Sequence, residues 1–371
     1  MVLFWTVAAA LGGTFVLGCG SGGGSGSSPP PAGPVVSEPT MAISIGGEIK
    51  LYTGLGDLAN SGPAPVPAQT ISAANVLSVA FDSSGDLYYL ANNGTIGSDA
   101  SFFHCTLPNA GLPFPPCTAV GGPIAGGKWL AIDSTGTVFA TSLTGSTGTI
   151  VSFPSTSGPP STPVVVYTST ALPALYGGIA VDGSNTVYVT ELPALGATYH
   201  LLSCTAACQG SSGSQVDLTS SITASYPASP PGGPLAIKGD GTTLLVGAAN
   251  TNPVALTALP IAFACAADGN GGLTCQPHTV SVPPLAGTDS PFVTTVGIAA
   301  SHAGNVYDAA LLTDGNTTDD PGPSFFGFDA AGAQFACSST PSTCRVSQLP
   351  SVPVNSVEDS VPYGLAVSHA P

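Results

Sequence analysis

The sequence predicts an all-β protein, and three observations support that prediction. Glycine and proline, with 48 and 36 residues among 371, are too frequent for long helices, because both are unfavourable in helix interiors. Only 6% of the residues are charged, and the helical spacing of apolar and charged residues is absent. Clusters of turn-forming residues recur about every ten residues, as expected for short strands. A chain of this length forms one large closed β domain or two smaller ones.

The clearest unit of the chain is Gly178–Glu191, which reads as two strands joined by a tight turn. Ile179–Val181 is a continuous run of apolar residues, as in a strand buried on both faces. Asp182–Asn185 supplies turn chemistry, since its side chains bond their own backbone and its glycine adopts positive φ freely. Val187–Thr190 is rich in β-branched and aromatic residues, which favour strands.

The first strand of this unit recurs, each time around an alanine. The six copies contain Ala80, Ala131, Ala180, Ala236, Ala299 and Ala366. In five copies a turn and a second strand follow, at Leu87–Leu90, Val138–Ala140, Val187–Val189, Leu244–Val246 and Val306–Tyr307. The copies recur roughly every 50 to 70 residues, which suits propeller blades with loop insertions. A small residue is needed where innermost strands converge on a central axis.

The sixth copy has no second strand after it, and two unassigned strands stand at the other end of the fold. Met41–Ile45 and Glu48–Tyr52 have the strand pattern that the sixth copy lacks. The sequence therefore predicts a six-bladed β-propeller in which the N-terminal strands complete the last blade and remove the open sheet edges. Seven blades remain an alternative if a divergent blade lies within 248–296 or 310–363.

The N-terminal region predicts export and lipid anchoring. Residues 1–18 are almost wholly apolar, and Gly18 precedes Cys19, as in a bacterial lipoprotein signal whose cysteine is lipidated after cleavage. An uncleaved membrane anchor is the alternative, since about 18 apolar residues just span a bilayer. Residues 19–36 are a Gly/Ser/Pro tether that lacks apolar periodicity. Residues 37–371 are the predicted propeller.

Eight cysteines remain when Cys19 is set aside, an even number in a chain expected to be exported. They fall into local pairs within single repeats, which predicts disulfides that fasten the outer hairpins. A zinc site at the Cys-x3-Cys pair lacks a second ligand pair nearby. The predicted disulfides join Cys105 to Cys117, Cys204 to Cys208, Cys265 to Cys275, and Cys337 to Cys344.

The pattern Gly-Ile-Ala-Val-Asp…Val-Tyr-Val-Thr-Glu of residues 178–191 resembles repeats of the NHL and streptogramin-lyase type of β-propeller, and more weakly those of gluconolactonase-like propellers. The resemblance extends as a repeated pattern over about residues 41–371. It implies a propeller fold, and the families include a lyase, lactonases and binding proteins. The catalytic and metal-binding residues of those families have no matching positions here, so the resemblance assigns no active site.

Candidate site residues follow from the geometry of propellers, whose ligands sit where loops enter first strands or leave second strands. Converging carboxylates without basic partners suit a hard cation such as Ca²⁺, and solvated loop charges are the alternative. The candidate metal ligands are Glu191, Asp308, Asp289, Glu358 and Asp359. The candidate ligand-binding residues are Asn92, Asn250, Tyr176, Tyr226 and Trp129.

Other polar residues have structural explanations. Asp82, Asp133 and Asp182 are predicted to be turn residues. His104 and His200 lie in predicted third strands, and His278 is expected at an exposed loop or edge. The acidic segment Asp314–Asp320 lacks the ligand spacing of a calcium loop. No order of Ser, His and Asp indicates a catalytic triad.

The charge balance narrows the partners. Four basic residues against 20 acidic ones give a net charge of -16, which disfavours nucleic acid and anionic lipid surfaces. The same charge also serves ordinary solubility. The sequence favours a monomeric, non-enzymatic scaffold, held at the bacterial cell envelope by its lipid, that binds a protein or small molecule. The rival hypothesis is a metal-assisted hydrolase or lyase with an acidic site at the channel mouth.

Overall fold

The computed structural model describes most of the chain between residues 40 and 368. The described ranges are 40–45, 47–93, 98–106, 116–145, 147–154, 164–169, 175–192, 198–205, 215–250, 259–280, 292–313, 324–335, 345–349 and 364–368. The contacts divide the chain into Met1–Val36 and Ser37–Pro371, and the second unit is described below. The predicted signal, Cys19 and the tether lie outside the described residues. Within the described ranges, no helix is long and apolar enough to cross a membrane.

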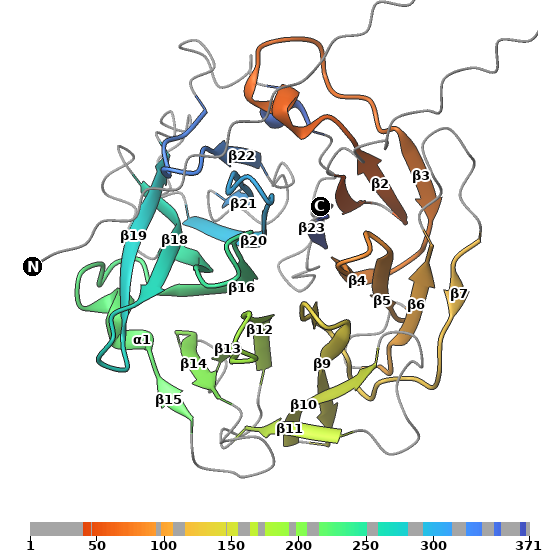
Figure 1. The fold of residues 1–371 in the computed structure, drawn as a ribbon, viewed down its shortest axis with the longest axis horizontal. Helices are drawn as coiled ribbons and strands as arrows, with labels where there is room; N and C mark the ends of the chain where they lie inside the picture. Colours follow the sequence, from red (N-terminus) through yellow and green to blue (C-terminus); the bar gives the residue numbers. More distant parts are fainter. Residues whose placement is uncertain are drawn as a thin grey trace, which may run out of the picture. The chain divides into compact units, whose positions relative to one another are not determined.

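The second unit is built from antiparallel sheets, which confirms the all-β prediction (Figure 1). Its described helices are short: α1 (Thr219–Thr223) and the 3₁₀-helices η1 (Leu55–Ala59) and η4 (Val346–Gln348). Four sheets have four strands each. One contains β4 (Val76–Phe81), β5 (Leu87–Ala91), β6 (Ser101–Cys105) and β7 (Thr118–Ala119). The next contains β8 (Leu130–Ile132), β9 (Thr137–Thr144), β10 (Thr147–Pro154) and β11 (Val164–Thr168). A third contains β12 (Leu175–Val181), β13 (Val187–Leu192), β14 (His200–Cys204) and β15 (Val216–Asp217).

The fourth of these sheets joins the two ends of the fold. It consists of β23 (Leu365–Val367), β1 (Met41–Ile45), β2 (Glu48–Tyr52) and β3 (Gln69–Ser72). β1 pairs with β23 through Met41↔Val367 and Ala42↔Ala366. The backbone N–H of Ser44 also donates to Gly364 O at 2.9 Å. The predicted closure by N-terminal strands is confirmed.

The remaining strands form one seven-stranded sheet rather than two separate ones. It contains β16 (Pro231–Ile237), β17 (Leu244–Asn250), β18 (Leu259–Ala267), β19 (Leu273–Val280), β20 (Phe292–Ala300), β21 (Val306–Thr313) and β22 (Ser324–Phe328). β17 and β20 pair directly at Ala249↔Thr294 and Asn250↔Val293. The structure therefore differs from the prediction of six separate blades. Four sheets are distinct four-stranded blades, and the other seven strands form one continuous sheet. The cause is that β17 extends beyond its own sheet and reaches β20.

The six alanine-containing strands of the sequence repeat occupy equivalent places. They are β4, β8, β12, β16, β20 and β23, and each contacts the next, with β23 contacting β4 to complete the cycle. Figure 1 shows these first strands facing a common centre within the unit. β12 and β16 approach most closely at glycines, where a Cβ on Gly178 would lie 2.5 Å from Gly233 O. Residues larger than glycine therefore do not fit at this contact.

Apolar side chains fill the layers between neighbouring sheets. One cluster joins Tyr88 and Phe102 of the β4–β7 sheet to Val138 and Phe153 of the β8–β11 sheet. The rings of Phe102 and Phe153 meet edge to face at 5.2 Å between centroids. Sheets packed face to face in this way bury both faces, which explains the continuous apolar runs in the sequence.

The aspartates in the tight turns between first and second strands follow the predicted chemistry, but in the 182–185 turn the residue with positive φ is Asn185, at 62°, and not Gly183 as expected. Asp182 Oδ1 accepts hydrogen bonds from the backbone N–H groups of Ser184 and Thr186, at 2.8 and 2.9 Å. Asp82 and Asp133 make the same pair of bonds in their own turns. The prediction that these aspartates are turn residues is confirmed.

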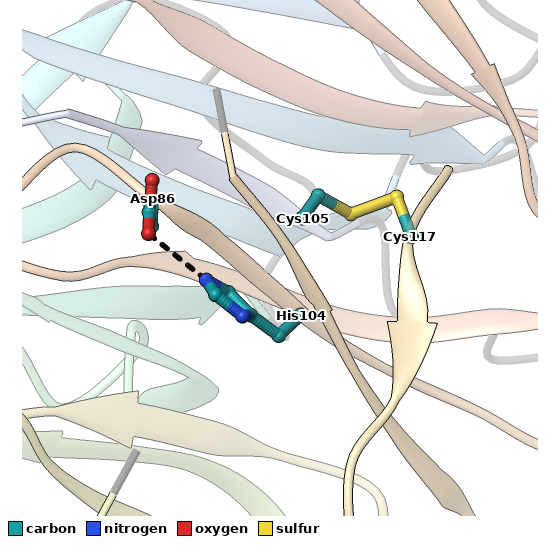
Figure 2. The surroundings of a disulfide bond; sticks show 4 residues. All are labelled: Asp86, His104, Cys105 and Cys117. Carbon is teal, nitrogen blue, oxygen red and sulfur yellow. Dashed lines mark hydrogen bonds and ion pairs between the residues drawn. A yellow bond between two sulfur atoms is a disulfide. The ribbon is translucent and has the colours of Figure 1, made fainter. Parts of the chain in front are cut away.

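Two of the four predicted disulfides are present, Cys105–Cys117 and Cys265–Cys275. The first fastens the outer strands β6 and β7, as Figure 2 shows, and the second joins directly opposed residues of β18 and β19.

Each of the other two predicted disulfides includes at least one cysteine outside the described residues. Cys204 is disulfide-bonded, but its predicted partner Cys208 lies outside the described residues. Cys337 and Cys344 both lie outside the described residues. The bridge that the sequence predicts between Cys337 and Cys344 is therefore not confirmed and stays a prediction.

Candidate functional site

Glu191 is the candidate residue with the most developed surroundings. It lies within β13, directly opposite Tyr176 of β12 and His200 of β14. Only 3% of the residue is exposed. The expectation that Glu191 follows the second strand in a loop is wrong, because β13 continues through Glu191 to Leu192, and its burial also excludes the alternative of a solvated loop charge.

Both carboxylate oxygens of Glu191 accept hydrogen bonds from the neighbouring sheet. The Tyr167 hydroxyl donates to Oε2 at 2.7 Å, and the Ser169 hydroxyl donates to Oε1. Tyr167 belongs to β11 and Ser169 follows it directly, so Glu191 links the β8–β11 sheet to the β12–β15 sheet. Among the ion pairs of the described residues, none joins Glu191 to a basic side chain.

Two further aromatic residues complete this group, which is called the Glu191 cluster (Glu191, Tyr167, Ser169, Tyr176 and Trp129). The Trp129 Nε1–H donates to Tyr176 O at 2.9 Å. The Tyr167 and Tyr176 rings meet edge to face at 6.3 Å. The Tyr176 hydroxyl is buried and has no hydrogen-bond partner among the described residues. Sequence reasoning selected Glu191, Tyr176 and Trp129, and the structure brings these three together.

The electrostatics of the Glu191 cluster reflect burial next to an acid. Burial raises the pKa of the Tyr167 phenol, and the charge of Glu191 and its hydrogen bond raise that pKa further. Burial, and then the Glu191 charge, also raise the pKa of Tyr176. Both phenols therefore stay protonated at neutral pH and are available as hydrogen-bond donors.

Lys128 is the basic residue beside this cluster. Its Nζ lies 5.8 Å from the centroid of the Trp129 ring. Burial lowers the pKa of the Lys128 amine. Its contact with the cluster therefore runs through Trp129, on the side of the β8–β11 sheet.

Asp308 lies elsewhere, inside β21, and is completely buried. The expectation that it follows the second strand at the channel mouth is wrong. It pairs with Ile298, in the register that Val189 has with Ile179, and so occupies a core position. Its Oδ2 lies 3.4 Å from Thr295 Oγ1, and its Oδ1 has no hydrogen-bond partner.

The surroundings of Asp308 favour its protonated form. Burial raises the pKa of the Asp308 carboxyl well above 3.8, although the Thr295 hydrogen bond acts in the opposite direction. The single hydroxyl proton of Thr295 is directed to Ile261 O. The Thr295 hydroxyl lies 3.4 Å from Asp308 Oδ2, so this hydrogen bond is long and compensates the burial of the carboxyl group only weakly.

The other described candidates belong to other strands and loops of the fold. Asn92 follows β5, and its backbone N–H donates to Asn75 O at 3.2 Å. Asn250 ends β17, in the pairing with Val293. Tyr226 follows α1 and packs its ring against Phe263 at 5.1 Å. Asp289, Glu358 and Asp359 lie outside the described residues, as does Asp314–Asp320. In the described part of the chain, no three His, Cys, Asp or Glu side chains gather closely enough to hold a metal ion.

His278 is a buried residue that the sequence reading missed. It lies within β19, is 2% exposed, and stacks on Phe328 with 4.8 Å between ring centroids. The expectation of an exposed position is wrong, because the β18–β19 hairpin packs against Phe328 and Gly332 rather than facing solvent. Burial, with a contribution from the Lys238 charge, lowers the pKa of His278 to about 4.

Two other histidines pair with aspartates near the surface. His104 Nε2 lies 2.9 Å from Asp86 Oδ2, next to the Cys105–Cys117 disulfide (Figure 2). His200 Nδ1 lies 3.1 Å from Asp217 Oδ2. Both histidines are in third strands and partly exposed, as the sequence predicted. No serine is hydrogen-bonded to either ring among the described contacts.

Comparison with known proteins gives distant structural likenesses. No protein-family model and no curated protein matches the sequence. TolB from Acinetobacter baumannii aligns over 81% of this chain and 63% of its own, with 11% identity and a TM-score of 0.47. A protein from Lactobacillus plantarum aligns over 80% of both chains, with 12% identity and a TM-score of 0.42. A PQQ-bound aldose sugar dehydrogenase from Streptomyces coelicolor aligns over 73% of this chain and 84% of its own, with 13% identity and a TM-score of 0.41.

Proposed function

We propose that this chain is an exported, lipid-anchored β-propeller that binds a ligand or protein partner at the bacterial cell envelope and does not itself catalyse a reaction. The observation that carries the proposal is the placement of Glu191 and Asp308. Both acids are buried in separate strands and face side chains of their own fold, where a hydrolytic metal site needs carboxylates that converge on an open position. A fold closed by the β1–β23 pairing is a suitable scaffold for presenting a binding surface to a partner.

We further propose that the domain has six blades. The cycle of contacts among β4, β8, β12, β16, β20 and β23 supports this number. In this interpretation β16–β19 form one blade and β20–β22 another, and the isolated bridge Phe328↔Gln334 marks the outer edge of the second. The β17–β20 pairing is then a link between two blades.

Export and anchoring rest on the N-terminal sequence and on the disulfides. The two outer-strand bridges suit an oxidising compartment. Lipidation of Cys19 would hold the propeller to a membrane through the tether, because a multiply acylated cysteine binds stably where one chain is marginal.

Replacing Cys19 with alanine tests the anchor. We expect the wild-type protein expressed in a bacterial host to partition into the detergent phase of a cloud-point extraction. The Cys19→Ala protein should move to the aqueous phase or retain its uncleaved leader. Mass spectrometry of the N-terminal peptide identifies the acyl groups. Equal partition of both proteins with an unmodified Cys19 would contradict the lipid anchor.

Calcium titration tests the non-catalytic role. We expect no saturable heat when Ca²⁺ is added to oxidised, chelator-treated protein lacking residues 1–36, and no rise in its melting temperature. Saturable binding that is lost in Glu191→Ala or Asp308→Ala would instead favour the rival hypothesis of a metal-assisted hydrolase or lyase. Asp57→Ala, at an exposed acid, is the control.

A further inference from the structure

The Glu191 cluster is a buried acidic site whose hydrogen bonding is incomplete. A buried carboxylate is costly unless opposite charge or several donors compensate it. Glu191 has two hydroxyl donors, from Tyr167 and Ser169, and no ion pair to a basic residue of the described chain. The carboxylate can accept further donors, because its two oxygens offer about four lone-pair sites.

The Tyr176 hydroxyl supplies a second, independent observation. Tyr176 is 6% exposed, and its hydroxyl has no hydrogen-bond partner. It stands directly across the strand pair from Glu191, and the Glu191 charge contributes to its raised pKa. Buried polar atoms without partners are rare in folded proteins. The acid and the unpartnered phenol are therefore cross-strand neighbours on one face of the β12–β13 pair, and each can form a further hydrogen bond.

The missing group must donate to a carboxylate and also satisfy a phenol oxygen. A primary ammonium group does both, since it carries three donors and a positive charge. The aromatic residues around it favour the same chemistry, because a cation is attracted to the faces of tyrosine and tryptophan rings. The Trp129 ring is held in place by its bond to Tyr176 O. The net charge of -16 attracts cations to the molecule.

We propose that the Glu191 cluster binds the terminal primary ammonium group of a ligand, with Glu191 as its counter-ion and Tyr176 as a hydrogen-bond acceptor. This inference rests on the proposed binding function and names the class of ligand for it. Because Glu191 and Tyr176 are both more than nine-tenths buried, the group that reaches them is narrow, as the end of an unbranched alkylamine is.

The experiment is calorimetric titration of the oxidised protein with n-butylammonium, with melting curves in parallel. Tetramethylammonium carries the same charge without N–H donors, n-butanol lacks the charge, and K⁺ lacks the alkyl chain. Glu191→Gln and Tyr176→Phe are the site variants. Glu48→Gln is the matched control, because it makes the same chemical change at an acid that is 47% exposed and pairs with Lys50.

We expect saturable binding of n-butylammonium and weaker responses to the three control solutes. Glu191→Gln should weaken binding about tenfold or more, and Tyr176→Phe roughly fivefold, because a charged and a neutral hydrogen bond are lost. Glu48→Gln should bind like the wild type. Circular dichroism verifies the fold of each variant, and Tyr176→Phe decides the matter if Glu191→Gln does not fold.

Three results would overturn the inference: no binding of n-butylammonium, equal binding by both site variants, or binding of K⁺ and tetramethylammonium as tight as that of the primary amine. None of them bears on the calcium titration. A silent calcium titration together with absent amine binding would leave the proposed scaffold standing and remove only its ligand class. Saturable calcium binding that is lost in Glu191→Ala or Asp308→Ala would remove the proposed scaffold itself.

Discussion

We expect the Asp308→Asn substitution to abolish the loss of stability that ionisation of Asp308 causes as the pH rises. The folded protein holds the Asp308 proton, because burial raises its pKa well above 3.8, whereas the unfolded chain releases that proton near 3.8. Between these two pKa values the folded state binds more protons than the unfolded state. Stability therefore falls with rising pH, by about 1.4 kcal/mol per pH unit.

The measurement is urea unfolding of wild-type and Asp308→Asn proteins from pH 4 to pH 8, with the disulfides oxidised. The amide oxygen can still accept from Thr295 and the amide cannot ionise, so the difference in unfolding free energy should grow in favour of the variant as the pH increases. The slope is the readout, because it does not depend on any fixed packing cost of the substitution. A difference that is constant with pH would show that Asp308 is ionised in the fold.

Replacing His278 with phenylalanine should remove a loss of stability at acidic pH. Burial holds the pKa of His278 at about 4, below its usual 6.5, so the unfolded chain takes up a proton that the folded protein refuses. The stabilising contribution is complete above pH 6.5 and is lost as the pH falls to about 4. The loss amounts to about 1.4 kcal/mol per pH unit, or about 3 kcal/mol over this window.

The His278→Phe protein keeps an aromatic ring against Phe328, and the same unfolding series measures its pH dependence. A fixed cost of about 1–3 kcal/mol from the larger ring is expected at every pH and leaves the slope unaffected. His104→Phe is the control, because His104 is partly exposed and paired with Asp86. An unchanged acid slope in His278→Phe would mean that the buried ring becomes protonated without difficulty.

The contributions of the two residues oppose one another over part of the pH range. Above about pH 4, the gain from deprotonation at His278 opposes the loss at Asp308, so the wild-type profile is shallower than the contribution of either residue alone. Each single variant should reveal the slope of the residue that remains, and the double variant should show neither. The pair therefore provides an internal check, because the two variants must change the profile in opposite directions.

The sequence predicted the repeated parts of the fold because their constraints are local. The first strands recur as apolar runs that contact one another in chain order, and the turn aspartates bond their own backbone. The partnership of the N-terminal strands with the last copy followed from counting strands. The fusion of β17 with β20 was not predictable, because it depends on how far a strand continues after its repeat ends.

The candidate acids were placed less well, for a reason that is visible in the strand register. Asp308 follows Val306-Tyr307 as Val189 follows Val187-Tyr188, and this alignment would have identified a core position. Glu191 was expected in a loop because the amino-acid composition of the segment does not indicate where β13 ends. Tyr167 and Ser169 could not be linked to Glu191, since that contact joins two sheets and follows no sequence spacing. His278 was missed because the surface over it comes from a distant part of the chain.

The pairing of β1 with β23 also sets the order in which the protein can become stable. Thr40 N donates to Ser368 Oγ across 328 positions of the chain, so the partner of the first strand leaves the ribosome long after that strand does. Until then the edge of β1 has no partner in β23, and closing so long a loop is slow. Because the ring cannot close early, the chain remains open while it is being synthesised. The β1–β23 pairing stabilises the closed ring, but it cannot form until β23 has been synthesised.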